Sequence, residues 1–416
     1  QWYRIQIKVN DRMIEIRDIL KLLPFKVERV GESFKTKHKK LEMEYKGFRY
    51  AGCTITDEEK EYIANDVLVV KEAMETMFTQ GHKKLTIGSC CLAEYRNLIG
   101  SKYYYELFPN LYEIPLDASV YGSSNAGQYI RNSYRGGWCY LARGKEGKIF
   151  HNGTTADVNS LYPSMMHSRS GNIYPVKLPT FWSGDYIPDE ALQYDKFYFL
   201  RIRTRFYLKD GMLPFIQNKS SFMYAVNESL ETSDIYNHET GEYCKEYIDL
   251  DGHIQQATMD MTLTMVDFQL IKEHYNLVDF EILDGCYFDG AIGIFDIYID
   301  KYKQMKMESK GALRELAKLF LNNLYGKLAS SPDSNFKVKD DKSIGFYTVV
   351  SHEKIPGYIP CGSAITSYAR NFTIRAAQQN YHGVDKRGFI YADTDSIHCD
   401  LAPKEIKGIK VDPKEF

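Results

Sequence analysis

The 416-residue sequence predicts a mixed α/β (α+β) fold. Helical periodicity over residues 55–80 and 311–329 predicts two long helices. Residues 148–158 and 388–400 have the shorter pattern of β-strands that end near aspartates. Between these segments, residues 170–300 form an acidic, mixed stretch with turn clusters, which predicts an irregular insertion. At roughly 150 residues per domain, the length predicts two to three domains.

The helix predicted for residues 55–80 begins with a clear local signal. Thr56 is expected to cap its N-terminus, and Glu59, three residues later, completes a capping box. Apolar residues follow at helical spacing and predict one buried stripe, made of Ile63, Val67, Val70, Met74 and Met77. Near the other end of the chain, the polar residues 331–360 predict a loop or hairpin, and residues 388–400 a β-hairpin.

The composition excludes several protein classes. Hydrophobic residues make up 44% and charged residues 26%, as in ordinary globular proteins, which excludes disordered, collagen-like and low-complexity chains. No apolar run is long enough for a transmembrane helix. The eight cysteines form no C-x-x-C pair, which argues against a zinc knuckle. The sequence lacks the motifs of P-loop NTPases, zincins and serine hydrolases.

A first candidate site lies in the segment DVNSLYPSM. Asp157 is expected at the end of a strand, and Ser160 and Pro163 can start a helix directly after it. The unpaired N–H groups of a helix start suit phosphate oxygens. In isolation, an ordinary strand-to-helix turn explains the segment equally well.

The helix predicted for residues 311–329 is the second candidate site. Spacings of four, four and three residues place Arg314, Lys318, Asn322 and Tyr325 on one face. The opposite face is apolar and consists of Leu313, Leu316, Ala317, Phe320, Leu324 and Leu328. Residues 301–330 hold 7 Lys/Arg against 2 Asp/Glu, and Lys306 and Lys310 extend the cationic row if the helix continues past Gly311. Such a face suits a nucleoside triphosphate, although a solvated charged face is the more common explanation.

The third candidate site is the segment YADTDS. Asp393 and Asp395 are two residues apart, so in an extended segment both carboxylates point to the same side and repel each other. A surface turn would explain this pair alone. Oxygen ligands without Cys or His favour Mg²⁺ or Mn²⁺. Together with Asp157 and the cationic helix, the pair predicts a two-metal phosphoryl-transfer site.

These motifs resemble those of the family B DNA polymerases, especially the protein-primed branch of phages and linear plasmids. DVNSLYP, KLFLNNLYG (residues 318–326) and YADTDS resemble the family's three polymerase motifs in order and spacing. Four further segments resemble known elements: YRGG (134–137), TSYAR (366–370), YIAND (62–66) and KLEMEY (40–45). The likeness extends across nearly the whole chain. One mild departure is Asn323, which stands where many relatives have serine.

The resemblance implies a role for each matching residue. Asp157 and Asp395 would bind two Mg²⁺ (or Mn²⁺) ions with the carbonyl of Val158, and Asp393 beside them would also be required. The dNTP would contact Tyr162, Lys306, Lys318, Asn322 and Tyr325, with Tyr162 excluding a ribose 2′-OH. The DNA-binding positions would be Tyr134, Gly136, Gly137, Ser160, Gly326, Thr366 and Arg370. Lys40, Tyr62 and Asp66 would be the remnant of an exonuclease site.

The resemblance also implies a domain order, with a right-hand palm and fingers and an antiparallel palm sheet. The expected segments are part of a ribonuclease H-like exonuclease domain (1–80), linker and first palm part (81–168), an insertion that receives the terminal protein (169–293), fingers (294–330), a DNA-encircling insertion (331–358) and second palm part (359–416). The other exonuclease motifs and the thumb would lie outside residues 1–416. The chain would therefore be an internal fragment without proofreading and with poor processivity.

The expected partners are primer–template DNA, dNTPs and a terminal protein. The chain would act as a monomer, without a membrane, in the cytoplasm of a host cell or in an organelle that carries a linear plasmid. Two alternatives remain open. One is an inactive polymerase remnant that binds DNA or a terminal protein. The other is a different enzyme with paired carboxylates, such as a glycosidase, against which the cationic helix argues because a sugar site needs no row of cations.

Overall fold

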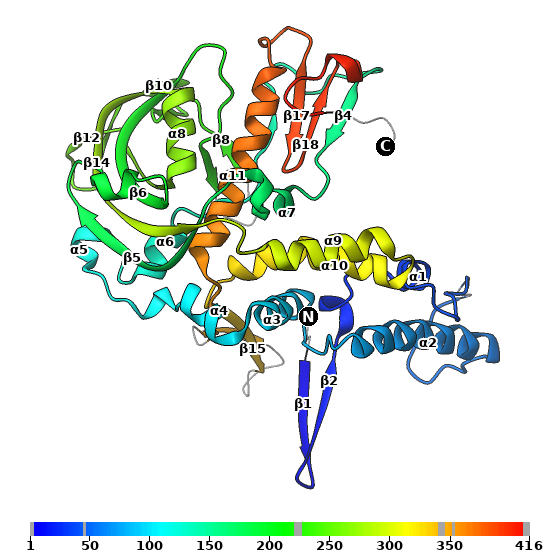
Figure 1. The fold of residues 1–416 in the computed structure, drawn as a ribbon. Coiled ribbons are helices and arrows are strands. Elements are labelled where there is room, and N and C mark those ends of the chain that lie inside the picture. The colour runs from blue at the N-terminus through cyan, green and yellow to red at the C-terminus, as the bar shows by residue number, and fades with distance from the viewer. Residues whose placement is uncertain (1–3, 45–46, 220–226, 340–345, 352–353, 411–416) are drawn as a thin grey trace. The chain divides into compact units, whose positions relative to one another are not determined.

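A computed structural model gives the structure of residues 4–44, 47–219, 227–339, 346–351 and 354–410 (Figure 1). The chain forms two compact units. The first contains residues 1–104 and 295–327, and the second contains residues 105–294 and 328–416. Each unit is therefore built from segments that are distant in the sequence. The domain boundaries inferred from the resemblance stay predictions.

The first unit is mainly helical. It begins with a two-stranded antiparallel hairpin, in which Ile5 pairs with Ile16 and Ile7 with Ile14. Aromatic side chains form much of its core; the buried Tyr95 packs against Phe295 and Tyr298, for example. The bounds of its elements are β1 (Arg4–Val9), β2 (Arg12–Arg17), α1 (Val27–Ser33), α2 (Asp57–Thr79), α3 (Ile87–Ile99), α9 (Asp296–Glu308) and α10 (Ala312–Leu328), whose last residue belongs to the second unit; α4 (Ser101–Leu107) spans the boundary.

Helix α2 confirms the predicted start but not the predicted buried stripe. The Thr56 hydroxyl accepts from the Glu59 amide at 3.2 Å, and the Glu59 carboxylate accepts from the Thr56 amide at 2.8 Å. Ile63 and Val67, however, are 51% and 61% exposed. The fully buried residues of this helix are Val69, Ala73 and Met77. The helix therefore buries its apolar side chains mainly in its C-terminal half, which periodicity alone does not reveal.

The second predicted helix is confirmed as α10, with its amphipathic faces as expected. Leu316, Ala317, Phe320, Leu324 and Leu328 are buried, whereas Arg314 and Asn322 are exposed. The helix does not continue toward Lys310, because α9 ends at Glu308 and Gly311 has a φ of 61°. This conformation favours glycine. The condition for extending the cationic row is therefore not met: Lys306 lies on a separate helix and Lys310 in the link.

A four-stranded antiparallel sheet with the order β3-β17-β18-β4 forms one part of the second unit. Its strands are β3 (Cys139–Leu141), β4 (Thr154–Asp157), β17 (Phe389–Asp393) and β18 (Ser396–Cys399). Helix α11 (Ile359–Gln379) packs against β17 and β18 (Figure 1), and the buried side chains of Ala156, Ala392 and Ile397 belong to the core of this unit. The predicted hairpin over residues 388–400 and the strand that ends at Asp157 are confirmed.

A second antiparallel sheet, with the order β13-β6-β14-β5, is formed by residues from the stretch expected to be irregular. Its strands are β5 (Tyr174–Ser183), β6 (Lys196–Leu208), β13 (Met259–Thr264) and β14 (Tyr275–Ala291), and α8 (Met265–His274) packs on it. The prediction of irregular structure is wrong here. Strand β6 has the alternation of a half-buried strand, with Leu200, Ile202 and Phe206 buried between more exposed arginines, a signal that the prediction did not use.

Short elements complete the second unit. The segment predicted as an insertion (169–293) also contains short strands, namely β7 (Gln217–Lys219), β8 (Asn227–Ser229), β9 (Ile235–Asn237), β10 (Glu242–Cys244), β11 (Glu246–Ile248) and β12 (Ile254–Gln256). The others are α5 (Ala118–Tyr121), α6 (Ala126–Arg131), α7 (Leu161–Met166), β15 (Ser334–Lys339) and β16 (Phe346–Ser351). β15 and β16 form an antiparallel hairpin, which matches the loop or hairpin predicted for residues 331–360; residues 340–345 and 352–353 lie outside the described residues.

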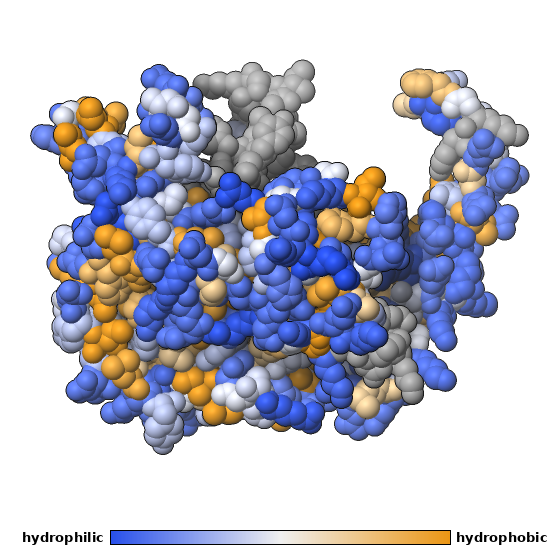
Figure 2. All heavy atoms as spheres, turned by 90° about the horizontal axis from the view of Figure 1, so that it is seen from above, coloured by the Kyte–Doolittle hydropathy of each residue, from blue (hydrophilic) through white to orange (hydrophobic). Residues whose placement is uncertain are grey.

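The surface shows no large apolar band on the face seen in Figure 2, where hydrophobic residues form small patches among hydrophilic ones. Within the part of the chain that the structure describes, no helix combines the length and hydrophobicity needed to cross a membrane.

Candidate active site

The three aspartates of the sequence analysis lie at one end of the first sheet. Asp157 pairs with Ser396 across β4 and β18, and Asp393 pairs with the same Ser396 across β17 and β18. On the far side, Asp393 pairs with Cys139 of β3. Directly opposed residues point to the same face of a sheet. The register therefore places four side chains in one row, with a carboxylate on each side of Ser396.

The turn between β17 and β18 adds the third carboxylate, that of Asp395. The Val158 amide donates to the Asp395 carbonyl at 2.8 Å, which fixes the turn against the end of β4. Thr394 has a φ of 56°, a conformation that a β-branched residue rarely adopts. Its amide donates to the Trp138 carbonyl at 2.9 Å, and its carbonyl accepts from the Thr373 hydroxyl at 2.8 Å. Backbone strain of this kind is typical of functional sites.

The electrostatics of the three carboxylates favour a cation. Burial raises the pKa of Asp395, and the negative charges of Asp157 and Asp393 raise it further. Among the described residues, no cationic side chain forms an ion pair with any of the three. Like charges held together without a cationic partner, and with oxygen as the only ligand atom of these side chains, suit Mg²⁺ or Mn²⁺. The residues present therefore fit the predicted metal.

Asp393 has two hydrogen-bond donors to a single carboxylate oxygen. The Cys139 thiol lies 3.1 Å from Oδ1, and the Thr394 hydroxyl lies 3.3 Å from the same atom. Sequence reasoning missed Cys139, because the register between β3 and β17, which are about 250 residues apart, cannot be read from either strand alone.

The YRGG segment is packed against the aspartate turn. A Cβ added to Gly137 would lie 2.3 Å from the Thr394 hydroxyl oxygen, so only glycine fits there. The carbonyls of Arg135 and Gly136 accept from Arg370 Nη1 at 2.7 and 2.8 Å. The segment thereby packs against the turn through Gly137, and the hydrogen bonds from Arg370 fix the segment in place.

Thr366 and Arg370 are buried instead of facing a groove. Thr366 is fully buried and donates to the Gly362 and Ser363 carbonyls of its own helix, at 3.3 and 3.2 Å. Arg370 is 4% exposed and pairs with Asp267. The structure therefore gives both side chains packing roles inside the unit, which differs from the direct DNA contacts expected for them.

The strand-to-helix turn after Asp157 is tighter than predicted. Ser160 precedes α7 with a φ of 54°, and its hydroxyl makes no capping hydrogen bond to that helix. The expectation of a hydroxyl-capped start is therefore wrong. Tyr162 follows on α7 and is half-buried. Since α7 has only six residues, its start is a weak anion site, and the carboxylates are the main feature of this region.

The residues expected to bind the dNTP belong, apart from Tyr162, to the first unit. Lys318 forms an ion pair with Glu315 at 2.6 Å, and Arg314 donates to the Lys306 carbonyl at 3.1 Å. Glu315 is a partner that the sequence analysis did not consider. On the same helix Asn322 and Gly326 are exposed and Tyr325 is half-buried. The structure thus joins Arg314 of α10 to the backbone of α9 within this unit.

Of the three residues expected to form an exonuclease remnant, Lys40 contacts both Tyr62 and Asp66 in the first unit. Lys40 Nζ lies 2.6 Å from the Tyr62 hydroxyl and 3.1 Å from Asp66 Oδ2. The hydrogen bond with Tyr62, followed by the contact with Asp66, raises the pKa of Lys40. The KLEMEY segment that contains Lys40 ends at residue 45, which lies outside the described residues.

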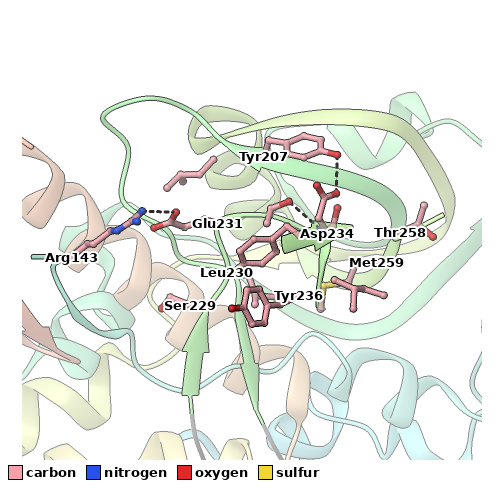
Figure 3. A pocket seen from close by; sticks show the side chains of 14 residues that line it. Arg143, Tyr207, Ser229, Leu230, Glu231, Asp234, Tyr236, Thr258 and Met259 are labelled. Atoms are coloured by element: carbon pink, nitrogen blue, oxygen red, sulfur yellow. Dashed lines mark hydrogen bonds and ion pairs between the residues drawn. The ribbon is translucent and has the colours of Figure 1, made fainter. Parts of the chain in front are cut away.

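Two other features do not resemble a phosphate site. A cavity of about 870 Å³ is lined mainly by residues of the segment predicted as an insertion (Figure 3). In its lining, Glu231 pairs with Arg143 at 3.5 Å and Asp234 accepts from the Tyr207 hydroxyl at 2.9 Å. Among the described residues, its one cationic lining residue, Arg143, is already paired with Glu231, which leaves no cation for a triphosphate. In the β11–β12 turn, ligand atoms of Asp249, Asp251 and His253 lie within 4.8 Å of one another. This cluster is exposed and distant in sequence from the three motifs.

Comparison with known proteins points in one direction. The profile of the family described as DNA polymerase type B, organellar and viral, matches residues 8–410. The DNA polymerases of Bacillus phages Nf and phi29 are each 38% identical over all of this chain, and that of Streptococcus phage Cp-1 is 28% identical. The chain spans about two thirds of the length of these relatives, 67%, 66% and 67% respectively.

Solved structures agree with the sequence comparison. Phi29 DNA polymerase in an orthorhombic crystal form has a TM-score of 0.78 and 35% identity, over 98% of this chain and 66% of that one. The ternary complex of phi29 DNA polymerase with primer–template DNA and incoming nucleotides has a TM-score of 0.76 and 36% identity, over all of this chain and 67% of that one. The similarity confirms the predicted fold class, a mixed α/β fold with antiparallel sheets.

Proposed function

The chain belongs to the organellar and viral type B DNA polymerases, and from this premise we propose that it catalyses template-directed addition of dNTPs to a primer 3′-hydroxyl. A terminal-protein hydroxyl would serve as the primer at initiation. The observation that carries the proposal is the row in which Asp157 and Asp393 flank Ser396, with Asp395 in the adjoining turn. It supports phosphoryl transfer because the charges of these carboxylates lack a cationic side-chain partner among the described residues.

Asp157, Asp393 and Asp395 would hold two divalent ions together with the backbone carbonyl of Val158. Bound Mg²⁺ or Mn²⁺ supplies charge neutralisation for the triphosphate and lowers the pKa of the primer hydroxyl. The chain's own residues contribute by holding the carboxylates in fixed positions. The hydrogen bond from Val158 to Asp395 keeps two of these carboxylates at adjacent strand ends, so little reorganisation is needed during the reaction.

The incoming nucleotide would contact the residues that the resemblance assigns to it. Lys306 and Lys318 would contact its phosphates, for which Lys318 would exchange its ion pair with Glu315. Tyr325 and Asn322 would form the pocket for the base pair. Tyr162, directly after the Asp157 turn, would lie under the sugar and reject a 2′-OH by contact.

The DNA-binding proposal divides into direct and indirect roles. Tyr134, Gly136, Ser160 and Gly326 would contact the primer or template backbone, which positions DNA without reading its sequence. Gly137, Thr366 and Arg370 would act through the packing that they maintain, since Gly137 abuts Thr394 and the other two are buried. The chain would act as a monomer on primer–template DNA with a terminal protein, inside the host cell of its phage or plasmid.

Primer extension tests this proposal. A labelled primer on a short template is incubated with the 416-residue chain, Mg²⁺ and dNTPs. The matched variants are Asp393→Asn at the proposed site and Asp249→Asn in the exposed acidic turn. We expect template-directed synthesis by the unmodified chain and by Asp249→Asn, and none by Asp393→Asn. Equal synthesis by all three proteins would show that the site is elsewhere.

The same labelled primer also tests for exonuclease activity and for the alternative of an inactive remnant. Without dNTPs we expect no shortening of the primer, because Asp66 is the one proposed exonuclease carboxylate and is paired with Lys40. If the unmodified chain binds the primer–template but extends it under no metal condition, the alternative of an inactive remnant is favoured. Shortening that disappears in Asp66→Asn would contradict the expected lack of proofreading.

A further inference from the structure

The thiol of Cys139 lies beside one of the three aspartates of the proposed site. Its Sγ lies 3.1 Å from Asp393 Oδ1, across the pairing of β3 with β17. An ionised carboxylate only accepts hydrogen bonds, so the thiol is the donor of this contact. The Thr394 hydroxyl lies 3.3 Å from the same oxygen. Both donors therefore act on Oδ1, and Oδ2 is outside this pair of contacts.

The position of Cys139 is fixed independently of Asp393. Its carbonyl accepts from Gln217 Nε2 at 3.0 Å. The preceding residue, Trp138, is fully buried, and its indole donates to the Pro214 carbonyl at 3.2 Å. The Trp138 carbonyl in turn accepts from the Thr394 amide. Because the strand is held from both sides, the thiol is a fixed donor toward which the carboxylate can orient.

Cys139 also differs from most cysteines of the chain in its exposure. Five of the eight, Cys90, Cys91, Cys286, Cys361 and Cys399, are buried fillers, whereas Cys139 is half-buried on the face that carries the aspartate row. Cys244 is similarly half-buried in the same unit, at the end of β10. It therefore offers a matched control that differs in its neighbours.

We propose that Cys139 is a positioning residue for the carboxylate of Asp393, an inference that rests on the proposed polymerase site. The thiol holds Oδ1, which presents Oδ2 to the divalent ion. Hydrogen-bond partners of ligating carboxylates orient them, and the loss of such a partner costs roughly 10- to 100-fold in metal affinity or activity. Since S–H is a weak donor, we expect an effect of about tenfold, at the lower end of that range.

Three variants of the full 416-residue chain separate the donor from the sulfur atom. Cys139→Ala removes the donor, Cys139→Ser retains an O–H donor at the same place, and Cys244→Ala removes a thiol away from the site. Binding of Mn²⁺ alone, measured by electron paramagnetic resonance, is the readout without catalysis. We expect the Mn²⁺ dissociation constant to rise about tenfold in Cys139→Ala and to stay near the unmodified value in the other two.

A second readout excludes a merely structural effect. In primer extension, the Mg²⁺ concentration for half-maximal rate should rise by the same factor in Cys139→Ala, while the KM for dNTP stays constant. A general packing defect would instead change both quantities and lower the melting temperature. Rescue by Cys139→Ser completes the argument, because serine restores a donor without restoring sulfur.

Each outcome bears on one idea. Mn²⁺ binding by Cys139→Ala that equals that of the unmodified chain overturns the positioning role, and so does an equal loss in Cys139→Ser. An unmodified chain that binds no Mn²⁺ overturns it as well. If Mn²⁺ binding responds as expected but the unmodified chain makes no DNA, the proposed function fails and the positioning role stands.

Discussion

Arg370 of α11 and Asp267 of α8 form an ion pair inside the second unit, with Nη2 and Oδ2 2.5 Å apart and side chains 4% and 3% exposed. The same Oδ2 accepts from the Ser367 hydroxyl at 3.0 Å. Through its other nitrogen, Arg370 holds the carbonyls of Arg135 and Gly136. The pair therefore links the helix on the second sheet to the segment that supports the aspartate turn.

Truncation of Asp267 should destabilise the protein strongly. Asp267→Ala leaves the buried guanidinium of Arg370 without its counter-charge, and such a loss typically costs about 3–5 kcal/mol of unfolding free energy. The control is Asp260→Ala, which breaks the ion pair with Arg203. In that pair the Arg203 side chain is 48% exposed and the Asp260 side chain is 40% exposed. Exposed pairs contribute about 0–1 kcal/mol. Urea unfolding of the three proteins measures both effects; equal losses would contradict the difference in burial.

Gly137→Ala should abolish primer extension without unfolding the chain. The new methyl group would lie 2.3 Å from the Thr394 hydroxyl oxygen, and Thr394 cannot yield easily because its amide and carbonyl are both hydrogen-bonded. Displacement of a reacting group by about 1 Å can cost roughly 100-fold in rate. The double variant Gly137→Ala/Thr394→Gly removes the clash and suits the positive φ, so it should recover part of the activity. Absence of any loss in the single variant would contradict the proposed support of the turn.

Much of this site could be predicted from the sequence, because its parts are local. The strand that ends at Asp157, the hairpin with Asp393 and Asp395, and the amphipathic α10 all follow from short-range patterns. Their functional grouping came from the order of motifs along the chain. These segments carry the residues of the proposed site, and sequence periodicity is informative where one face of an element is buried and the other is exposed.

The remaining features depend on contacts between distant residues. Cys139 reaches Asp393 only through the strand register, and Arg370 is an interior cation only because Asp267 lies opposite it. Strand β6 is different, because the alternation of buried residues with arginines over residues 200–206 is a local signal that identifies a strand. The break at Gly311 was also open, since glycine is tolerated in helices but is common at their ends.

Gly326→Ala should separate a ligand contact from a structural effect. Apart from Gly326 itself, its two chain neighbours and the nearby backbone of α10, no heavy atom of the described residues lies within 4 Å of the Cβ that alanine would add. Replacement of a helical glycine by alanine typically stabilises by about 0.5–1 kcal/mol. We therefore expect a higher melting temperature together with slower primer extension, because Gly326 is proposed to face DNA. An unchanged rate would remove Gly326 from the proposed DNA-binding positions.

His274 should make the stability of the second unit depend on pH. The ring is 2% exposed and its Nδ1 lies 2.7 Å from the Leu213 carbonyl, to which it donates. Burial lowers its pKa, and the charges of Arg375 and Lys209 act in the same direction, against the Leu213 carbonyl and Glu273. The unfolded chain, with a histidine pKa of about 6.5, therefore takes up a proton first as the pH falls. Stability is lost below that pH, by up to about 1.4 kcal/mol per pH unit for one proton.

Urea unfolding at pH 7.5 and 5.5 measures this dependence. His274→Gln keeps an N–H donor for Leu213 but cannot be protonated, so its unfolding free energy should fall less between the two pH values. His82, whose pKa is also lowered by burial, is present in both proteins and contributes equally to both. The comparison therefore isolates His274. An equal decrease in the two proteins would assign the pH dependence to other groups, because the buried neutral ring would then have the same proton affinity as in the unfolded chain.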